Sequence, residues 1–387
     1  MKGRWLFSTV VAGALAALFG RRASAVERNL AGSAQFDWHF VPKPSSALPN
    51  RQIPLDGFTT EAALKIAVDI SSKLSANVKV CYGCHGFELP MAYFDYRVAD
   101  ELNFRVGRFS PSFGNFNLRH DPANHKFSDK PLAYDMGRML RMREWNLGVL
   151  PSPFPDNGLE INGTHWFGLK AQLDWAVYAV NGFRGDKSGQ DLDFQASRTR
   201  DSYYVDNNGR PTVGARVALT VKAGDKTDIG LGASAMHGTF DPNNQLHYTI
   251  AGADLAFRFD RTNLRFEWLA RRQEFDASDR SMFRYAMPAS GGDFFVKHGA
   301  YVELEQPLSK SVELLFRVDG LYRKGNVVAE SPLRRQSAVT RFTLGTAIVL
   351  ERGYRVKVSG EYWDFSDPGE GGRHRDLGLH VGLVGTY

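Results

Sequence analysis

The residues with the clearest chemical signature lie in a short segment that holds both cysteines of the 387-residue chain. They are Cys81 and Cys84, and His85 follows the second one directly. Cys-x-x-Cys-His is the attachment motif of c-type haem. Its spacing lets the two thiols add to the two vinyl groups of one haem, while the adjacent histidine ligates the iron as the proximal ligand. The sequence therefore predicts one covalent haem c, held by Cys81, Cys84 and His85.

Two other interpretations of the cysteine pair stay open. Cys81 and Cys84 could form a tight disulfide, because oxidising compartments outside the cytoplasm permit one. They could also supply half of a zinc site, although the chain has no second cysteine pair to complete it. The histidine directly after the second cysteine favours the haem over both.

A haem attached at this motif would take any sixth ligand from another part of the chain. A methionine in that position raises the iron potential, whereas a second histidine generally lowers it. The candidates are Met91, His120, His125, Met136, Met139 and Met142. The last three recur at helical spacing, which is equally typical of core packing, so the sequence does not choose among the six.

The first 25 residues are typical of a cleaved secretory signal. Lys2 and Arg4 precede an apolar stretch from Trp5 to Gly20, and Ala23-Ser24-Ala25 fits a small-residue cleavage site. The alternative is a membrane anchor, but the stretch is somewhat short for a spanning helix. Removal of this segment, with its four basic residues, lowers the formal charge from +6 to about +2. No basic surface then suggests a nucleic-acid partner.

The rest of the chain contains segments in which apolar and polar residues alternate. The clearest are Leu264–Trp268, Val312–Arg323 and Tyr354–Tyr362. Side chains alternate between the two faces of a strand, so one face of each segment is apolar and the other charged. A soluble β-sandwich would alternate in the same way. Short polar turns between paired strands, aromatic residues at strand ends and an alternating C-terminal segment, Leu377–Tyr387, favour a transmembrane barrel.

The short turns set the number of strands. Seven are expected, at 72–75, 99–101, 170–172, 224–226, 260–263, 308–310 and 351–353. They join fourteen strands, a last strand from about Leu377 makes fifteen, and Ala34–Phe40 closes the ring as the sixteenth. Fourteen or eighteen strands remain alternatives. The predicted fold is therefore an all-β, antiparallel transmembrane barrel over residues 26–387, with short periplasmic turns and long extracellular loops.

Two features of this barrel concern the predicted haem. The motif at 81–85 is expected in a loop on the extracellular side, between strands at Ala76–Val80 and Ala92–Val98. The longest loop runs from about 109 to 162 and contains a predicted helix from Pro131 to Leu147, capped by Ser128 or Asp129. We hypothesise that this loop folds inward and narrows the lumen.

Charged residues that alternate toward the barrel interior are the candidates for lining a pore. They are Lys65, Lys79, Arg97, Arg105, Arg265, Glu267, Arg317, Asp319, Arg355 and Lys357. Other inward charges are Arg216, Arg258, Arg341, Asp69, Asp95, Asp174, Asp254, Glu303, Glu305, Glu313 and Glu361. Basic and acidic members nearly balance, whereas selective anion channels carry a basic excess. A phosphate-specific path is therefore not supported.

The segment Phe104–Gly114 suggests a family. Its pattern Arg-x-Gly-Arg-Phe, followed by Phe-Gly, resembles the strand and turn of the phosphate-selective porin family. The resemblance covers this motif and the general strand spacing. It implies a sixteen-stranded porin-like barrel and, because such barrels are often trimers, a homotrimer. The cysteine motif is a departure from that family.

Three functions follow from these features. The leading hypothesis is electron transfer at a Gram-negative outer membrane, with periplasmic or extracellular redox partners. The second is a general diffusion porin for small solutes whose haem is structural or sensory. The third is haem enzyme chemistry, ranked lowest because the chain shows no other catalytic motif.

Overall fold

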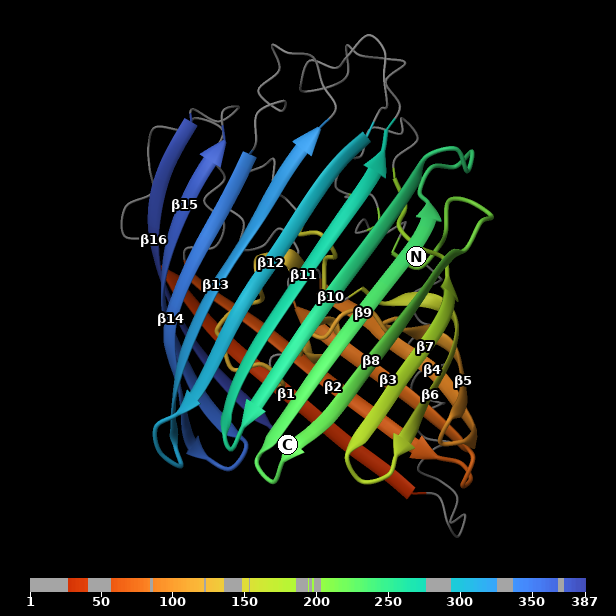
Figure 1. Ribbon diagram of the computed structural model, residues 1–387, viewed down its shortest axis with the longest axis horizontal. Helices are drawn as coiled ribbons and strands as arrows, with labels where there is room; N and C mark the ends of the chain where they lie inside the picture. The colour runs from red at the N-terminus through yellow and green to blue at the C-terminus, as the bar shows by residue number, and fades with distance from the viewer. Residues whose placement is uncertain are drawn as a thin grey trace, which may run out of the picture.

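The chain forms one closed antiparallel barrel of sixteen strands, as the turn count predicts (Figure 1). A computed structural model describes residues 27–40, 57–83, 86–121, 123–135, 148–152, 154–185, 194, 197, 203–275, 294–325, 337–367 and 372–387. The strands are β1 (Glu27–Phe40), β2 (Gly57–Asp69), β3 (Leu74–Gly83), β4 (Gly86–Ala99), β5 (Leu102–Phe109), β6 (Asp156–Phe167), β7 (Ala171–Val180), β8 (Thr212–Gly224), β9 (Thr227–Thr239), β10 (His247–Phe259), β11 (Thr262–Glu274), β12 (Phe294–Pro307), β13 (Val312–Gly325), β14 (Ser337–Glu351), β15 (Tyr354–Asp367) and β16 (Gly372–Thr386). The predicted signal segment, 1–25, lies outside the described residues.

The seven predicted short turns are confirmed, because each falls between an even-numbered strand and the next one. Closure by the first and last strands is confirmed as well. In that seam Ser33 pairs with Thr386 and Phe40 with Leu379. β1 begins at Glu27 rather than at Ala34, because residues 27–33 pair with residues 63–69 of β2.

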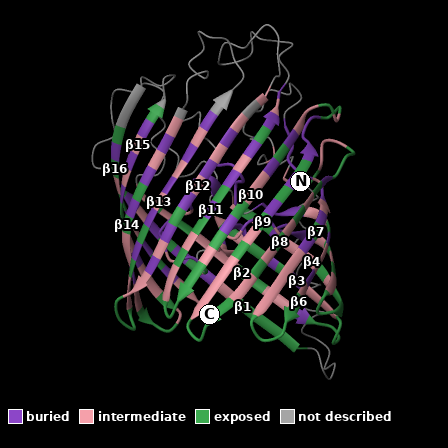
Figure 2. Ribbon diagram, in the orientation of Figure 1, coloured by how far each residue is buried: buried purple, intermediate pink, exposed green. Residues whose placement is uncertain are grey.

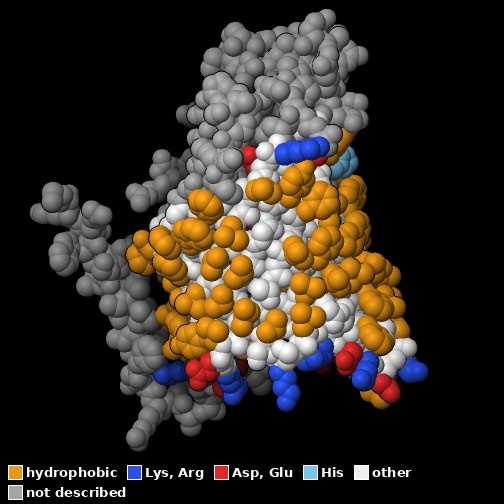
Figure 3. Space-filling view, turned by 90° about the vertical axis from the view of Figure 1, so that its left-hand side faces the viewer, with side chains coloured by type: hydrophobic (Ala, Val, Ile, Leu, Met, Phe, Trp, Pro, Cys, Tyr) orange, Lys and Arg blue, Asp and Glu red, His pale blue; other side chains and the backbone are white. Residues whose placement is uncertain are grey.

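The two faces of the barrel wall differ as the alternation predicts. In β1, Phe36 and Phe40 are exposed on the outside, whereas Asp37 and His39 between them are buried. Figure 2 shows the same alternation along most strands, and Figure 3 shows an apolar band above a rim of charged side chains. This arrangement is typical of a barrel that stands in a bilayer. Among the described residues, no helix has both the length and the apolar composition needed to cross a membrane.

The wall near the cysteine motif is taller than expected. β3 continues through Cys81 to Gly83, and β4 begins already at Gly86, with Gly83 and Gly86 paired. The expected strands, Ala76–Val80 and Ala92–Val98, were therefore too short, and the described motif residues, 81–83, belong to β3. The alternation was misleading here because Leu89 and Pro90 interrupt it, where the β3–β4 register shifts.

The long loop between β5 and β6 lies inside the ring of strands, which confirms the hypothesis that it folds inward (Figure 1). It carries two 3-10 turns, η1 (Asn117–Arg119) and η2 (Leu132–Tyr134). The predicted helix from Pro131 begins only as η2, because Asp135 returns to an extended conformation; residues 136–147 lie outside the described part. Neither Ser128 nor Asp129 caps it. Asp129 instead pairs with Arg317 and Arg341.

Substitution of Gly163 by valine is expected to destabilise the barrel. A Cβ atom at this position in β6 would lie 1.9 Å from the carbonyl oxygen of Glu101, a backbone atom that cannot move aside cheaply. Overpacking of this kind costs about 1–3 kcal/mol. Urea unfolding of the refolded protein in detergent measures the loss. Gly360→Val in β15 is the control, because no atom lies within 4 Å of the Cβ it adds; equal losses in both variants would contradict the packing argument.

Candidate functional site

The inward loop is held to β11 by one buried carboxylate. Glu267 accepts hydrogen bonds from the backbone N–H groups of Asn115 (2.7 Å) and Phe116 (3.1 Å). It also accepts one from the hydroxyl of Tyr134, on a later part of the loop, and one from the hydroxyl of Tyr301 in β12 (2.8 Å). Because a single carboxylate satisfies four donors away from water, it fixes two separate parts of the loop against the same wall.

A second set of charges holds the loop to β13 and β14. Asp129 of the loop pairs with both Arg317 and Arg341. Arg341 also pairs with Asp319 (2.6 Å), which in addition lies 3.5 Å from Nε of Arg317 and accepts a hydrogen bond from the N–H of Leu132 (2.7 Å). All these side chains are buried, so the charges compensate one another inside the barrel. The loop is thus fixed to the wall from β11 to β14.

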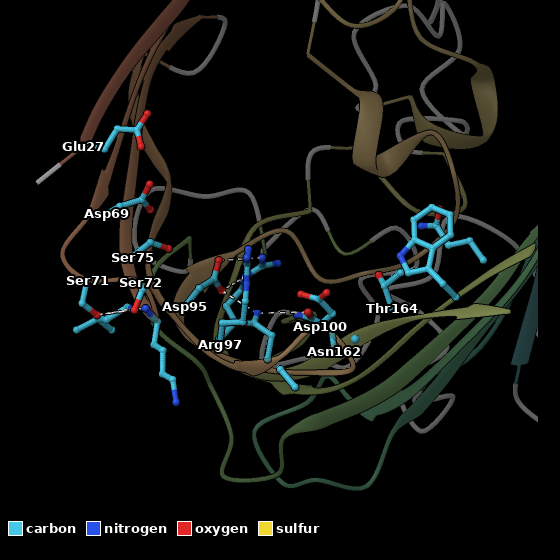
Figure 4. Close-up of a pocket in the computed structure, with 18 residues that line it drawn as sticks. Glu27, Asp69, Ser71, Ser72, Ser75, Asp95, Arg97, Asp100, Asn162 and Thr164 are labelled. Carbon is cyan, nitrogen blue, oxygen red and sulfur yellow. Dashed lines mark hydrogen bonds and ion pairs between the residues drawn. The ribbon is translucent and has the colours of Figure 1, made fainter. Parts of the chain in front are cut away.

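Two adjoining cavities, together called the passage here, lie on the other side of the lumen. Its wider part, here called the vestibule, is a cavity of about 810 Å³ at the short-turn end, lined from β1, β2, the β2–β3 turn, β4, β5, β6 and β7 (Figure 4). Its narrower part, the constriction, is a cavity of about 220 Å³ between the wall and the loop residues Ser112 and Leu118. Both are lined by Arg105, Asn162, Gly163 and Thr164, so they adjoin.

The charges of this passage nearly balance. Arg105, between vestibule and constriction, pairs with Asp95 (2.8 Å) and Glu160 (3.1 Å). Arg216, across the constriction, pairs with Asp254 (2.6 Å). The charged lining residues of the vestibule are Glu27, Asp69, Asp95, Asp100, Lys73, Arg97 and Arg105. A passage of this composition lacks the excess of one sign that strong ion selectivity needs.

Only some of the predicted pore-lining residues line the described cavities. Arg97 and Arg105 line the described cavities. Five others contact the inward loop: Lys79, Glu267, Arg317, Asp319 and Lys357. Arg265 pairs with Glu303 and Glu305 of β12. Lys65 and Arg355 line neither cavity. Sequence reasoning missed Ser112 and Leu118, because no local pattern shows which part of a long loop faces the passage.

The described part of the cysteine motif lies on the lumen side. Cys81 is a half-buried free thiol on the same face of β3 as Lys79, which pairs with Asp121 of the inward loop. Cys84 and His85 lie outside the described residues. The backbone from Cys81 to Gly83 is extended and paired on the β4 side, Tyr82 with Phe87 and Gly83 with Gly86. The described residues thus give the motif one half-buried thiol on the lumen side, and the haem stays a prediction.

The predicted sixth ligands are dispersed. His120 is linked to the motif strand through Asp121: its Nε2 is 3.3 Å from the Asp121 carboxylate that pairs with Lys79. His125 is buried near Phe116, on the side of the lumen where Lys357 donates to its carbonyl oxygen (2.8 Å). Met91 pairs across the strands with Lys79. Met136, Met139 and Met142 lie outside the described residues.

Acidification is expected to weaken the fold through His120. Burial lowers the pKa of this loop histidine from 6.5 to about 4. The His120 side chain therefore becomes protonated near pH 6.5 in the unfolded chain, but only near pH 4 in the folded protein. The free energy of unfolding falls as the pH drops from about 6.5 to about 4, by about 3 kcal/mol at most. Chemical unfolding across this range should show a flatter pH dependence for His120→Gln. An unchanged profile would contradict this, and the exposed His165→Gln is the control.

Comparison with solved structures decides the architecture. The outer-membrane channel DcaP of Acinetobacter baumannii matches with a TM-score of 0.58 at 12% identity, over 95% of this chain and 99% of its own. The anion-selective porin from Comamonas acidovorans matches at 0.55 and 12% identity, over 94% and 100%. Salmonella typhi OmpF matches at 0.57 and 11% identity, over 93% and 97%.

The fold is that of the outer-membrane porins. No protein-family model matches the chain, and no curated protein resembles it in sequence. At these identities the porin likeness concerns the fold alone. What passes through the lumen, and what the cysteine motif holds, must be argued from this chain's own residues.

Proposed function

We propose that this protein is an outer-membrane diffusion channel for small polar solutes. The observation that carries the proposal is the passage beside the fixed inward loop: a vestibule of about 810 Å³ that adjoins a constriction lined by polar and charged side chains. Because the described part of the loop is anchored to the opposite wall, we take this passage as the route for solutes. The porin fold, the apolar outer band and the predicted export signal support an outer-membrane location.

The charge of the passage argues for weak selectivity. One structural neighbour is described as an anion-selective porin. In this chain, however, Arg105 and Arg216 in the constriction face Glu160 and Asp174, so neither sign dominates. The proposal therefore includes no phosphate selectivity, in line with the balanced lumen charges that the sequence predicts. Assembly as a homotrimer remains part of the proposal, and cross-linking of the native protein in membranes tests it.

Planar-bilayer recording tests the channel directly. The purified, refolded protein should give stepwise conductance with a cation-to-anion permeability ratio near one. A channel that is closed to small ions under all conditions would overturn the proposal. Liposome swelling with sugars of increasing size then gives the exclusion limit of the constriction.

Electron transfer through a covalent haem is the second candidate function. The motif Cys81-x-x-Cys84-His85 and the lumen-facing side of Cys81 favour it. Two described candidates for a sixth ligand are linked to Lys79 on the motif strand: Met91 as its cross-strand partner, and His120 through Asp121. Bound haem would supply one-electron redox chemistry, while the two thiols would anchor it and His85 would ligate the iron. A redox partner at either membrane face would then be required.

A pyridine haemochrome spectrum of the denatured protein, expressed together with a haem-attachment system, tests the second candidate. Haem that remains bound after denaturation in the wild type, and is lost in Cys81→Ser/Cys84→Ser, is the expected result if it is correct. Absence of bound haem in the wild type would rule it out and would leave the channel proposal untouched.

A further inference from the structure

Three metal-binding side chains meet at the seam where the barrel closes. Asp37 and His39 are two residues apart on the inner face of β1, and His380 lies on β16 directly opposite His39 in the antiparallel register. The rings of His39 and His380 are 3.7 Å apart between centroids. One donor atom from each of the three side chains lies within 4.8 Å of the other two. Barrel closure thus brings together residues that are more than 340 positions apart in the sequence.

The potential ligand atoms of Asp37 and His380 are buried and close together, but they do not form a hydrogen bond with each other. Nε2 of His380 lies 3.2 Å from Oδ1 of Asp37. Nevertheless, within the described part of the chain neither atom has a partner in hydrogen-bond geometry, and neither has Nδ1 of His380. His380 is only 2% exposed. Buried polar atoms of native proteins are normally satisfied, so these atoms call for a ligand that the protein chain does not supply.

The spacing suits a small divalent cation. Zinc binds histidine nitrogen and carboxylate oxygen at about 2.0–2.2 Å, which places neighbouring tetrahedral ligands about 3.3 Å apart. The 3.2 Å between Nε2 of His380 and Oδ1 of Asp37 agrees with this separation. Two imidazoles and one carboxylate favour Zn²⁺ and similar transition-metal ions over Mg²⁺ and Ca²⁺, which prefer oxygen ligands throughout.

Neighbouring residues shape the cluster. Gln35 Nε2 donates to the other carboxylate oxygen of Asp37 (2.5 Å), as outer residues of metal sites do when they orient a ligand. Gly382 lies opposite Asp37, and a Cβ atom there would come within 2.5 Å of Oδ1 of Asp37. The nearby cation Lys357 pairs across the strands with Gly382, but its ammonium group donates to the carbonyl oxygen of His125.

We propose that Asp37, His39 and His380 bind one divalent transition-metal ion of the Zn²⁺ class and thereby join the first and last strands of the barrel. Three protein ligands leave a fourth coordination position for water. Since two ligands come from β1 and one from β16, the bound ion stabilises the seam, and it binds the closed barrel only. The competing interpretation is a protonated His380 paired with Asp37, with no metal.

Zinc titration of the refolded, full-length barrel in detergent tests the proposal. After treatment with EDTA and removal of the chelator, isothermal titration calorimetry with ZnCl₂ should show one site per chain. Asp37→Asn and His380→Gln should each raise Kd at least about a hundredfold, and Gln35→Leu about tenfold, the range typical of outer residues. Zn²⁺ should raise Tm in the wild type but not in His380→Gln.

The control is His237→Gln, which removes one ring of another cross-strand histidine pair, His237 and His247, with centroids 5.3 Å apart. It should leave Kd unchanged. Gly382→Ala, which crowds Asp37 and leaves all three ligands in place, is an independent variant should His380→Gln fail to fold; it should also weaken binding. No saturable binding by the wild type, or equal binding by Asp37→Asn and the wild type, would overturn the site in favour of the ion pair.

Discussion

Glu267→Ala is expected to release the inward loop, with a severalfold rise in single-channel conductance and a large loss of stability. The substitution leaves four buried donors without their acceptor: the N–H groups of Asn115 and Phe116 and the hydroxyls of Tyr134 and Tyr301. Each unsatisfied buried donor costs about 1–3 kcal/mol, so the free energy of unfolding should fall by about 3 kcal/mol or more. Planar-bilayer recording and urea unfolding measure the two effects.

Two variants make this result specific. Glu267→Gln retains one carbonyl oxygen and should give a smaller change in both measurements, because an amide can still accept from part of the donor set. Glu351→Ala removes an exposed carboxylate at the β14–β15 turn and should change neither. If Glu267→Ala lowered stability but left the conductance at its wild-type value, the loop would not be what limits the passage.

Opposite charges placed at Leu118 are expected to shift ion selectivity in opposite directions. Leu118 belongs to η1, lines the constriction and is 53% exposed, so a longer polar side chain finds room there. Two unit charges about 4 Å apart in water interact by about 1 kcal/mol, which corresponds to a factor of about five in local ion concentration. Leu118→Arg should therefore favour anions and Leu118→Glu cations, each by up to about fivefold, in reversal-potential measurements.

The paired design separates charge from shape. Both variants lengthen the same side chain, so any common effect reports on size and the difference reports on charge. Leu308→Glu adds the same charge at the exposed β12–β13 turn and should leave selectivity unchanged. High salt should reduce the difference between the Leu118 variants, because exposed charges are screened. Equal selectivity in both variants at low salt would show that ions do not pass Leu118.

The barrel itself was predictable because its signals are local. Alternation in a segment such as Tyr354–Tyr362 sets the two faces of a strand, and short polar stretches mark the turns. Even the pairing of the first and last strands followed from the need to close every backbone hydrogen bond. The predicted strand ends were wrong where the alternation of apolar and polar residues is interrupted. In β3 and β4 the pairing continues through Cys81 and Gly86, although Leu89 and Pro90 break the alternation.

The interior was less predictable because its contacts join distant parts of the chain. Asp129 was expected as a helix cap, and it pairs instead with arginines that lie about two hundred residues later. The cluster of Asp37, His39 and His380 has no sequence signature, since His380 comes from the opposite end of the chain. The haem motif is the reverse case: its signature is strong in sequence, but of its two cysteines the structure describes only Cys81, and the haem stays a prediction.

At the closing seam, β1 extends beyond the end of β16. β16 ends at Thr386 opposite Ser33, and Tyr387 adds one more backbone pair with Gly32. Within the described residues, the stretch from Glu27 to Ala31 has β2 as its only strand neighbour. The amide of Leu30 points to the same open edge as that of Gly32. Deuterium should therefore replace hydrogen quickly at Leu30 and slowly at Phe36, whose amide points to the same side but is covered by β16, so that exchange marks where β16 stops protecting β1.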